Sequence, residues 1–162
     1  MTGREHHYRV DVRWTGNTGL GTSSYKAYAR DHVIFSPGAD KPDIAGSSDP
    51  AFRGDPRRWN PEELYVAAIS ACHKLWYLHL CAANGIVVTE YFDEAEGVMV
   101  ESAGGGGQFA SVTLRPRIVL TRAADIGVAR TLHHEAHAKC FIANSIKTPV
   151  EVDPEFTAAD QV

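Results

Sequence analysis

The most reactive side chains in this chain belong to three cysteines, Cys72, Cys81 and Cys140. An odd number of widely spaced cysteines, without a C-x-x-C pair, predicts neither a disulfide framework nor a zinc ribbon. At least one of them is therefore expected to serve packing or chemistry. A cysteine that attacks a substrate does so as the thiolate, which forms most readily beside a cation.

Two of the cysteines fall on one apolar segment. Cys81 follows Cys72 by nine residues, a rotation of about 180° on an ideal helix, so the two side chains point in opposite directions. We interpret Cys81 as core packing. An unpaired cysteine in a buried helix is usually packing as well, so a reactive role for Cys72 depends on the sequence around it.

An arginine held in place by a carboxylate would supply such a cation. Glu62 lies ten residues before Cys72, about 15 Å away along one helix, so the two cooperate only through a bend or a bridging group. The candidate arginines lie in or beside a long polar segment: Arg30, Arg53, Arg57 and Arg58.

Residues 60–72 read N-P-E-E-L-Y-V-A-A-I-S-A-C, which resembles the segment around the peroxidatic cysteine of the OsmC and Ohr peroxidases. The resemblance extends over nearly the whole chain. It implies a single OsmC-like domain over residues 1–162, of the α+β class, with antiparallel sheets packed around a long cysteine-bearing helix and a second helix. It also implies an intertwined homodimer with active sites at the subunit interface.

By position, the resemblance assigns Cys72 as the peroxidatic cysteine, Cys140 as the resolving cysteine that forms a disulfide with it, and Glu62 as the site carboxylate. We assign the arginine to Arg53, with Arg30 as the alternative. The implied activity is the reduction of organic hydroperoxides, with hydrogen peroxide as a second substrate, in oxidative-stress defence. It follows the thiolate, sulfenate and disulfide ladder. The implied partners are the hydroperoxide and a dithiol reductant, lipoyl-type or a small thiol, and no cofactor is expected.

Apolar residues near the cysteine favour an organic peroxide, because burying an alkyl tail gains ~0.8 kcal/mol per methylene. We assign Tyr65, Trp76 and Phe52 to substrate binding.

The residues after Cys140 differ from the family pattern: K-C-F-I-A-N stands where the family has C-P-V-S or C-P-Y-S. Without that proline, the second helix is expected to continue to about Asn144. The helix would then hold Cys140 too far from Cys72 for a disulfide, since the Cα atoms of bridged cysteines lie within ~7 Å of each other. A one-cysteine peroxidase with an external thiol is the alternative mechanism.

Two other functions stay open. His133, His137 and Cys140 share one helix face and have ligand types that suit zinc. The H-E-A-H run is one residue short of the metalloprotease pattern, and we predict no metal site. A protein of the same fold could also bind a small apolar ligand without catalysis, with Cys72 kept for packing.

The charge balance excludes two classes of partner. The chain has 16 basic and 20 acidic residues, a net charge of -4, without a run of five like charges, so we expect neither nucleic-acid nor membrane binding. The first twelve residues lack the apolar core of a secretory signal. We predict a cytoplasmic protein.

Short strands and a long loop are expected before the cysteine helix. Residues 8–15 alternate apolar and polar side chains, the period of a half-buried strand, and residues 22–36 read as further strand. Residues 38–59 are rich in Gly, Pro, Asp, Ser and Arg, and a loop of that length is often a functional lid or arm.

Asn60 is expected to cap a helix that starts at Pro61 and runs to Asn84, with Gly85 as its stop. Apolar residues nearly encircle this helix, so it should be buried on most sides. Residues 86–102 and 108–121 predict a second hairpin. A helix over 124–141 and a strand over 148–156 complete one α+β unit.

Overall fold

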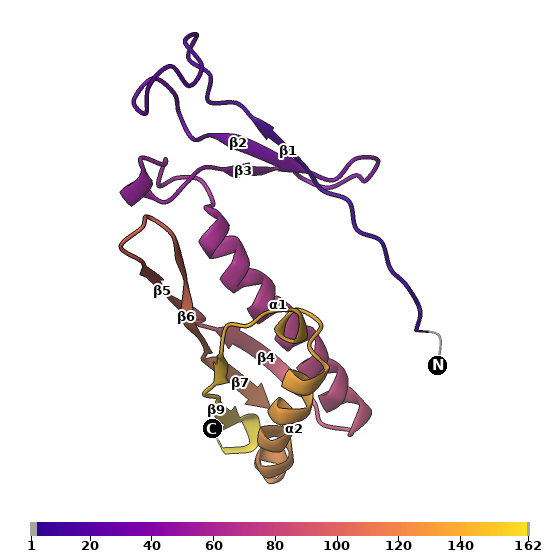
Figure 1. Cartoon of the computed structure of the whole chain (residues 1–162). Helices are drawn as coiled ribbons and strands as arrows, with labels where there is room; N and C mark the ends of the chain where they lie inside the picture. Colours follow the sequence, from indigo (N-terminus) through magenta and orange to yellow (C-terminus); the bar gives the residue numbers. More distant parts are fainter. Residues whose placement is uncertain (1–2, 162) are drawn as a thin grey trace. The chain divides into compact units, whose positions relative to one another are not determined.

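The computed structural model of the chain describes residues 3–161. Within them, the chain forms three short strands, an α-helix, four strands, a second α-helix and two closing strands (Figure 1), which confirms the predicted α+β class. The chain divides into two compact units, Met1–Leu64 and Tyr65–Val162.

The first unit holds an antiparallel sheet of three strands in the order β1-β2-β3. Its strands are β1 (Asp11–Trp14), β2 (His32–Phe35) and β3 (Ile44–Gly46), side by side in Figure 1. The first strand is thus shorter than the predicted 8–15. The prediction of strand over residues 22–31 was wrong, because turns and irregular backbone fill this stretch.

Local hydrogen bonds explain why strand does not form after β1. The Asn17 side-chain oxygen accepts the backbone N–H groups of Gly19 and Gly21 at 2.9 and 3.0 Å. Thr18 donates its hydroxyl proton to the Ala27 carbonyl at 2.6 Å. These bonds occupy backbone groups that a β-ladder would need.

Residues 38–59, predicted as a loop, contain strand β3 at residues 44–46 and a short 3-10 helix, η1 (Pro50–Phe52), and the end of the segment returns to β3. Trp59 donates its N–H to the Ala45 carbonyl at 3.1 Å, and its own carbonyl accepts the Ser47 N–H at 3.0 Å. Asp49 starts η1 by accepting the backbone N–H two residues on, at 2.7 Å. Backbone hydrogen bonds to β3 and Ser47 therefore order the end of this segment.

The first long helix, α1 (Pro61–Ala83), begins at the predicted residue and ends one residue before the predicted Asn84. The Asn60 side chain accepts the Glu63 N–H at 2.8 Å, and the Glu63 carboxylate accepts the Asn60 N–H at 3.1 Å. This reciprocal pair is a capping box. At the other end, Gly85 takes a φ of 70° and closes a Schellman motif.

One stripe of α1 is exposed, although apolar residues surround the helix. The prediction of burial on most sides is therefore not met within a single chain. The buried side chains are Ile69, His73, Tyr77, Leu80 and Cys81, whereas Ala68, Ala71, Leu75 and His79 are exposed.

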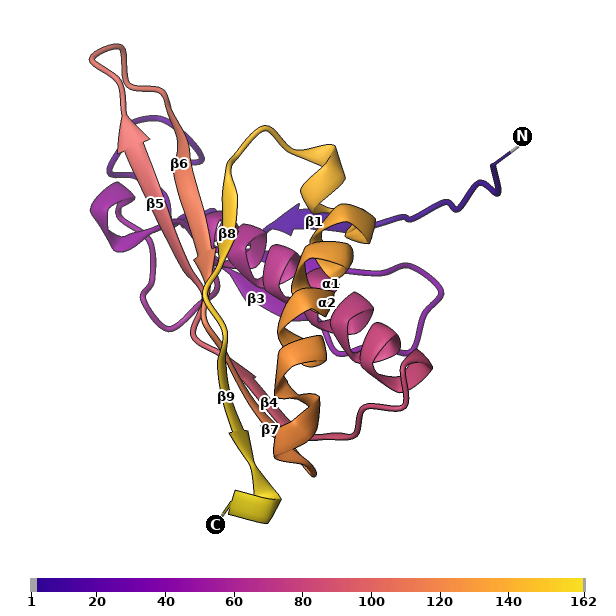
Figure 2. The same ribbon diagram turned by 90° about the horizontal axis from the view of Figure 1, so that it is seen from below.

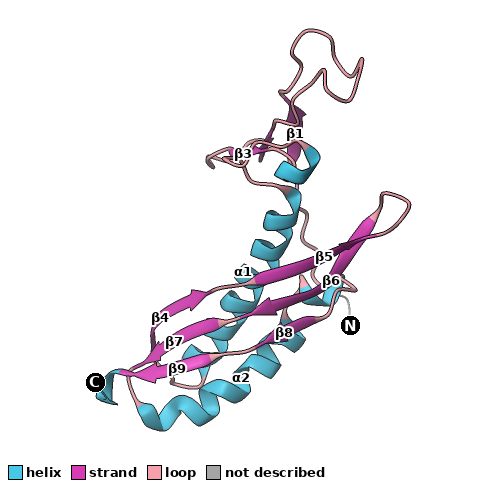
Figure 3. Ribbon diagram, turned by 90° about the vertical axis from the view of Figure 1, so that its left-hand side faces the viewer, coloured by secondary structure: helices cyan, strands magenta, loops and turns pink. Residues whose placement is uncertain are grey.

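The second unit contains two sheets of three strands, in the orders β4-β7-β9 and β5-β6-β8. Each strand of one continues almost directly into a strand of the other, so together they form one bent sheet (Figure 3). Asp93 holds the bend by accepting the Arg115 N–H at 2.7 Å. The strands are β4 (Val88–Asp93), β5 (Glu96–Glu101), β6 (Gly107–Leu114), β7 (Pro116–Leu120), β8 (Val150–Val152) and β9 (Glu155–Ala158).

The two closing strands run parallel to their neighbours. β8 pairs with β6 and β9 pairs with β7 in parallel register, whereas β4 with β7 and β5 with β6 are antiparallel. The cause is the second long helix, α2 (Ile126–Lys139), which returns the chain along the sheet before β8 begins. The sheet is therefore mixed rather than wholly antiparallel.

Both helices lie on one face of the bent sheet (Figures 2 and 3). The core between them and β7 includes Cys81, which is 1% exposed and whose thiol pKa is raised by burial. This position agrees with its interpretation as packing. The buried core side chains are Tyr77, Leu80, Cys81, Ile86, Ile118, Leu120, Ala129, Leu132 and Ala136.

Two buried histidines join α1 to α2. His73 Nε2 and His133 Nδ1 are 2.9 Å apart, and the Tyr77 ring stacks on His133 with 4.0 Å between ring centroids. Burial first, and the neighbouring His137 second, lower the pKa of His73 to about 4. Burial first, and His73 second, lower the pKa of His133 to about 3. Both rings are therefore neutral at neutral pH, and one N–H lies between them.

Acid should destabilise the second unit through this pair. The unfolded imidazoles have a pKa near 6.5, whereas the folded values are about 4 and 3. Below pH 6.5 the two imidazoles are therefore protonated in the unfolded chain but not in the folded one. The free energy of unfolding falls progressively as the pH drops from 6.5 toward 4. We expect the Tm, measured by circular dichroism, to drop between about pH 7.5 and about pH 5. In the double variant His73→Leu with His133→Leu this drop should be smaller. The exposed His134→Gln control should keep the full drop, and equal drops in all three proteins would contradict the assignment.

Candidate active site

Cys72 and Cys140 are neighbours in the second unit. Cys72 lies in the middle of α1 and is half-buried, whereas Cys140 directly follows α2 and is 1% exposed. Burial first, and the adjacent Cys72 thiol second, raise the pKa of Cys140 to about 11. Both cysteines are free thiols. The two sulfurs are thus close enough to interact, and Cys140 stays protonated at neutral pH.

The position of Cys140 depends on where α2 ends. The sequence predicts a helix to about Asn144, but its last residue is Lys139, and Cys140 has an extended backbone with φ −66° and ψ 111°. Asn144 supplies the reason: its side-chain amide donates to the Ala138 carbonyl at 2.9 Å, and its N–H donates to the Cys140 carbonyl at 3.0 Å. These bonds satisfy the Ala138 and Cys140 carbonyls, so α2 ends here although the proline of the family pattern is missing. The prediction that a longer helix keeps the two sulfurs apart was therefore wrong.

A backbone donor points at the Cys140 sulfur. The Ala143 N–H donates to Sγ at 3.4 Å, which favours the thiolate and partly offsets the effect of burial on the pKa. Sequence reasoning missed both Ala143 and Asn144. The one available signal was an asparagine, a common capping residue, four positions after the cysteine.

Aromatic rings bring the chain after α2 against α1. Trp76, one turn after Cys72, meets Phe141 edge to face, with 5.8 Å between ring centroids. The Lys139 ammonium lies 5.8 Å from the Trp76 ring. The predicted substrate residue Trp76 thus lies beside the segment that carries Cys140. Phe141 and Lys139 are additional residues that sequence reasoning did not identify.

Tyr65 lies two turns before Cys72, on the same face of α1. Its hydroxyl is 2.8 Å from Thr148 Oγ1, and its ring stacks on Phe109 with 4.7 Å between centroids. The Tyr65 ring therefore belongs to a packed apolar layer between α1 and the sheet.

Arg53, the assigned arginine, and Arg30, the alternative, both lie in the first unit but differ in their contacts. Arg30 donates to the Tyr28 and Tyr25 carbonyls at 2.6 and 2.8 Å and lies over both rings, at 4.1 and 4.3 Å. Arg53 has a left-handed backbone, with φ 68°, and its guanidinium lies 6.0 Å from the Tyr25 ring. Within residues 3–161 the Arg53 guanidinium makes neither a hydrogen bond nor an ion pair, so it is the freer of the two.

The other two predicted residues are also in the first unit. Phe52 ends η1 and is 36% exposed, and Glu62 is half-buried in the first turn of α1. The structure thus groups Cys72, Cys140, Tyr65 and Trp76 in one unit, and Arg53, Phe52 and Glu62 in the other.

Within residues 3–161, His, Cys, Asp and Glu side chains do not gather in groups of three that could hold a metal ion. His133, one member of the alternative zinc set, directs Nδ1 at His73 instead.

The helices within residues 3–161 are too short or too polar to cross a membrane.

The difference in burial predicts a difference in alkylation. With a pKa of about 11, Cys140 has roughly one thiolate in a thousand molecules at about pH 8. We expect iodoacetamide to modify the half-exposed Cys72 first, and Cys140 at a rate that rises about tenfold per pH unit. Peptide mass spectrometry over time measures both rates. Protein unfolded in guanidinium is the control, and fast labelling of Cys140 in the folded protein would contradict its burial.

The family described as OsmC-like protein matches residues 54–155, more than half of the chain. An OsmC-like protein of unknown function from Vibrio cholerae is 29% identical, with a TM-score of 0.81, over 93% of this chain and 99% of that one. An organic hydroperoxide resistance protein from Elizabethkingia anophelis is 20% identical, with a TM-score of 0.66, over 96% of this chain and 99% of that one. A second organic hydroperoxide resistance protein, OhrB of Bacillus subtilis, is 21% identical, with a TM-score of 0.62, over 94% of this chain and 98% of that one. Curated proteins give no significant sequence match. On the strength of the match over residues 54–155, the chain belongs to the OsmC-like protein family.

Proposed function

We propose that this protein is a thiol-dependent peroxidase that reduces organic hydroperoxides through Cys72, with Cys140 as the resolving cysteine. Family membership supports the proposal, as do the names of two similar structures, which are organic hydroperoxide resistance proteins. The observation that carries it is the interaction of the two thiols, one half-buried on α1 and the other buried at the end of α2.

The proposed reaction has three steps. The Cys72 thiolate attacks the outer oxygen of the hydroperoxide, the O–O bond breaks, and the alcohol leaves after taking up a proton, so that Cys72 becomes a sulfenic acid. The Cys140 sulfur then attacks the Cys72 sulfur, water leaves, and a disulfide forms. A lipoyl-type dithiol or a small thiol reduces this disulfide and is itself oxidised. The proposed setting is the reducing cytoplasm.

The order of the two cysteines follows from their burial. The raised pKa keeps Cys140 as the thiol at neutral pH, so it competes poorly for the peroxide, whereas Cys72 is partly open to it. We further propose that Arg53 and Glu62 orient the peroxide oxygens. The apolar side chains proposed to receive the organic group are Tyr65, Trp76 and Phe52.

A single-turnover assay tests the mechanism. Reduced protein mixed with one equivalent of cumene hydroperoxide should give a Cys72–Cys140 disulfide, mapped by alkylation and mass spectrometry. Cys140→Ser should stop at a Cys72 sulfenic acid that dimedone traps, and Cys72→Ser should lose peroxide consumption by more than about a hundredfold.

Cys81→Ser is the matched control and should turn over like the wild type. Two unmodified thiols after peroxide treatment would rule out the peroxidase. A sulfenic acid in the wild type without a bridge would instead assign resolution to an external thiol.

We also propose that the protein is a homodimer in which a second copy covers the exposed stripe of α1. Leu75 is 63% exposed at the centre of the stripe, with Ala68, Ala71 and His79 along it. A 23-residue helix that is apolar all round is expected to be covered on most sides. This stripe therefore fits a protein partner better than solvent.

Sedimentation velocity tests the dimer. The wild type should sediment as a dimer, and Leu75→Glu should shift it toward the monomer, because a carboxylate would be desolvated at the interface. Val128→Glu, at a 52% exposed position on α2 outside the stripe, should leave the dimer intact. A wild-type monomer at every concentration would refute the proposal.

A further inference from the structure

A cavity lies between α2 and the closing strands, all within the second unit. Its volume is about 440 Å³, inside the range of roughly 300–1,000 Å³ that small-molecule sites occupy. It is lined by Arg130, His133, His134 and His137 of α2, and by Val150, Val152, Asp153 and Pro154 of β8 and the turn after it.

His133 forms the inner wall of this cavity and is 4% exposed. Its Nδ1 is bonded to His73, whereas its Nε2 is buried and has no hydrogen-bond partner within residues 3–161. The two nitrogens of an imidazole point in nearly opposite directions, so Nε2 faces away from α1. A buried polar nitrogen without a partner is uncommon in folded proteins and marks a place for a ligand atom.

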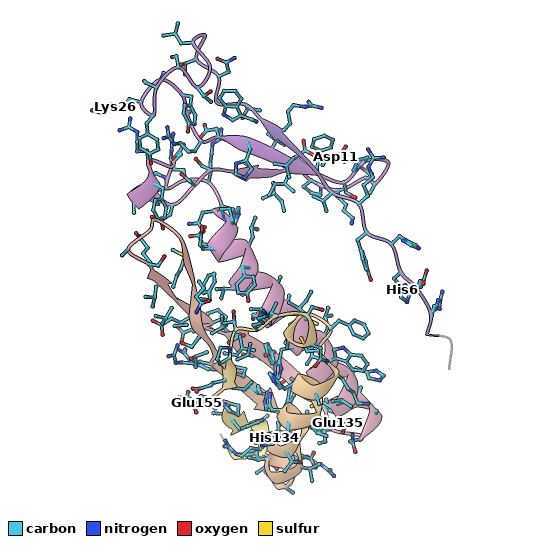
Figure 4. The ribbon with its side chains drawn as sticks, viewed as in Figure 1. His6, Asp11, Lys26, His134, Glu135 and Glu155 are labelled. Atoms are coloured by element: carbon cyan, nitrogen blue, oxygen red, sulfur yellow. The ribbon has the colours of Figure 1, made fainter. Side chains whose placement is uncertain are left out.

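Cationic and imidazole groups gather on the α2 side of the cavity. The Arg130 Nη1 group donates to the Pro154 carbonyl at 3.2 Å, and the guanidinium lies 4.9 Å from the Phe156 ring. These two contacts fix the guanidinium and leave its other N–H groups without partners in residues 3–161. His134, labelled on α2 in Figure 4, and His137 add two more imidazoles to the same wall. This wall suits a ligand with hydrogen-bond acceptors and negative charge.

The opposite wall has a different character. Val150, Val152 and Pro154 present apolar surface, and Asp153 is the one carboxylate among the lining residues. A bare inorganic anion would leave this wall uncovered, and a neutral alkane would leave the guanidinium and the imidazoles without acceptors. A small carboxylate with a short hydrocarbon chain satisfies both walls, because arginine binds carboxylates in a bidentate manner and the chain covers the valines.

We propose that this cavity binds a short-chain organic carboxylate, whose head group contacts Arg130 and the imidazole wall and whose hydrocarbon chain packs on Val150, Val152 and Pro154. An acceptor at His133 Nε2 selects the tautomer in which this nitrogen carries the proton. In that tautomer, Nδ1 accepts the proton of His73 Nε2. The site uses other residues than the thiol pair, so it stands whether or not the protein is a peroxidase.

The test is a titration of the reduced, full-length, ¹⁵N-labelled protein with hexanoate, followed by amide and imidazole NMR spectra. Hexanoate at on the order of tens of millimolar should saturate shifts on α2 and β8 and should fix the ¹⁵N shift of His133 Nε2 at its protonated value. Arg130→Gln should weaken binding about tenfold or more, whereas Arg117→Gln, an exposed arginine on β7 outside the cavity, should bind like the wild type.

Two matched probes separate the parts of the ligand. Hexanol lacks the charge and inorganic phosphate lacks the chain, so each should bind at least about tenfold more weakly than hexanoate. Equal binding of hexanol would overturn the role of Arg130, and equal binding of phosphate would overturn the role of the apolar wall. Absence of shifts with hexanoate would refute the site. None of these readouts involves peroxide, so failure here and failure of the peroxidase proposal are distinguishable.

Discussion

The hydrogen bond between His73 and His133 sets how α1 and α2 meet in the second unit. Helices that pack through apolar side chains alone tolerate small shifts, whereas a shift here would leave two buried nitrogens unsatisfied. Cys72 directly precedes His73, and Cys140 follows His133 by seven residues, two helical turns. The helix register that makes the imidazole bond is therefore the one that brings the two thiols together.

Much of α1 was predictable because its signals are local. Asn60 and Glu63 form the capping box that their spacing indicates, and Gly85 ends the helix. The histidine pair was not predictable, since its members are 60 residues apart and each looks like an ordinary polar residue in its own helix. The end of α2 was missed for a related reason: the prediction took the missing proline as a sign that the helix continues, whereas the Asn144 side chain caps the Ala138 carbonyl and the helix ends at Lys139.

Contacts between residues far apart in the sequence also explain the errors in predicting the sheets. A period of two identifies strands but not their partners, so the parallel pairing of β8 and β9 depends on the path of α2. Residues 22–31 contain residues compatible with strand, yet the turn bonds of Asn17 and Thr18 determine the backbone there. Spacing along α1 likewise places Glu62 relative to Cys72, but it does not place Arg53, which follows η1 in the segment before the helix.

The high pKa of Cys140 suits the resolving role proposed for it because of what leaves in that step. The sulfenic acid on Cys72 gives up its hydroxyl group, which needs a proton to depart as water, and the Cys140 thiol carries one. The departing hydroxyl group therefore takes the proton of the Cys140 thiol. Cys140 does not need to be a thiolate before it attacks. Once deprotonated, a thiol of higher pKa is also the stronger nucleophile, with a Brønsted coefficient of about 0.4–0.5. In the proposed reaction, burial would thus keep Cys140 from consuming peroxide while Cys72 is reduced, and it would leave Cys140 able to attack the adjacent sulfenic acid once that acid has formed.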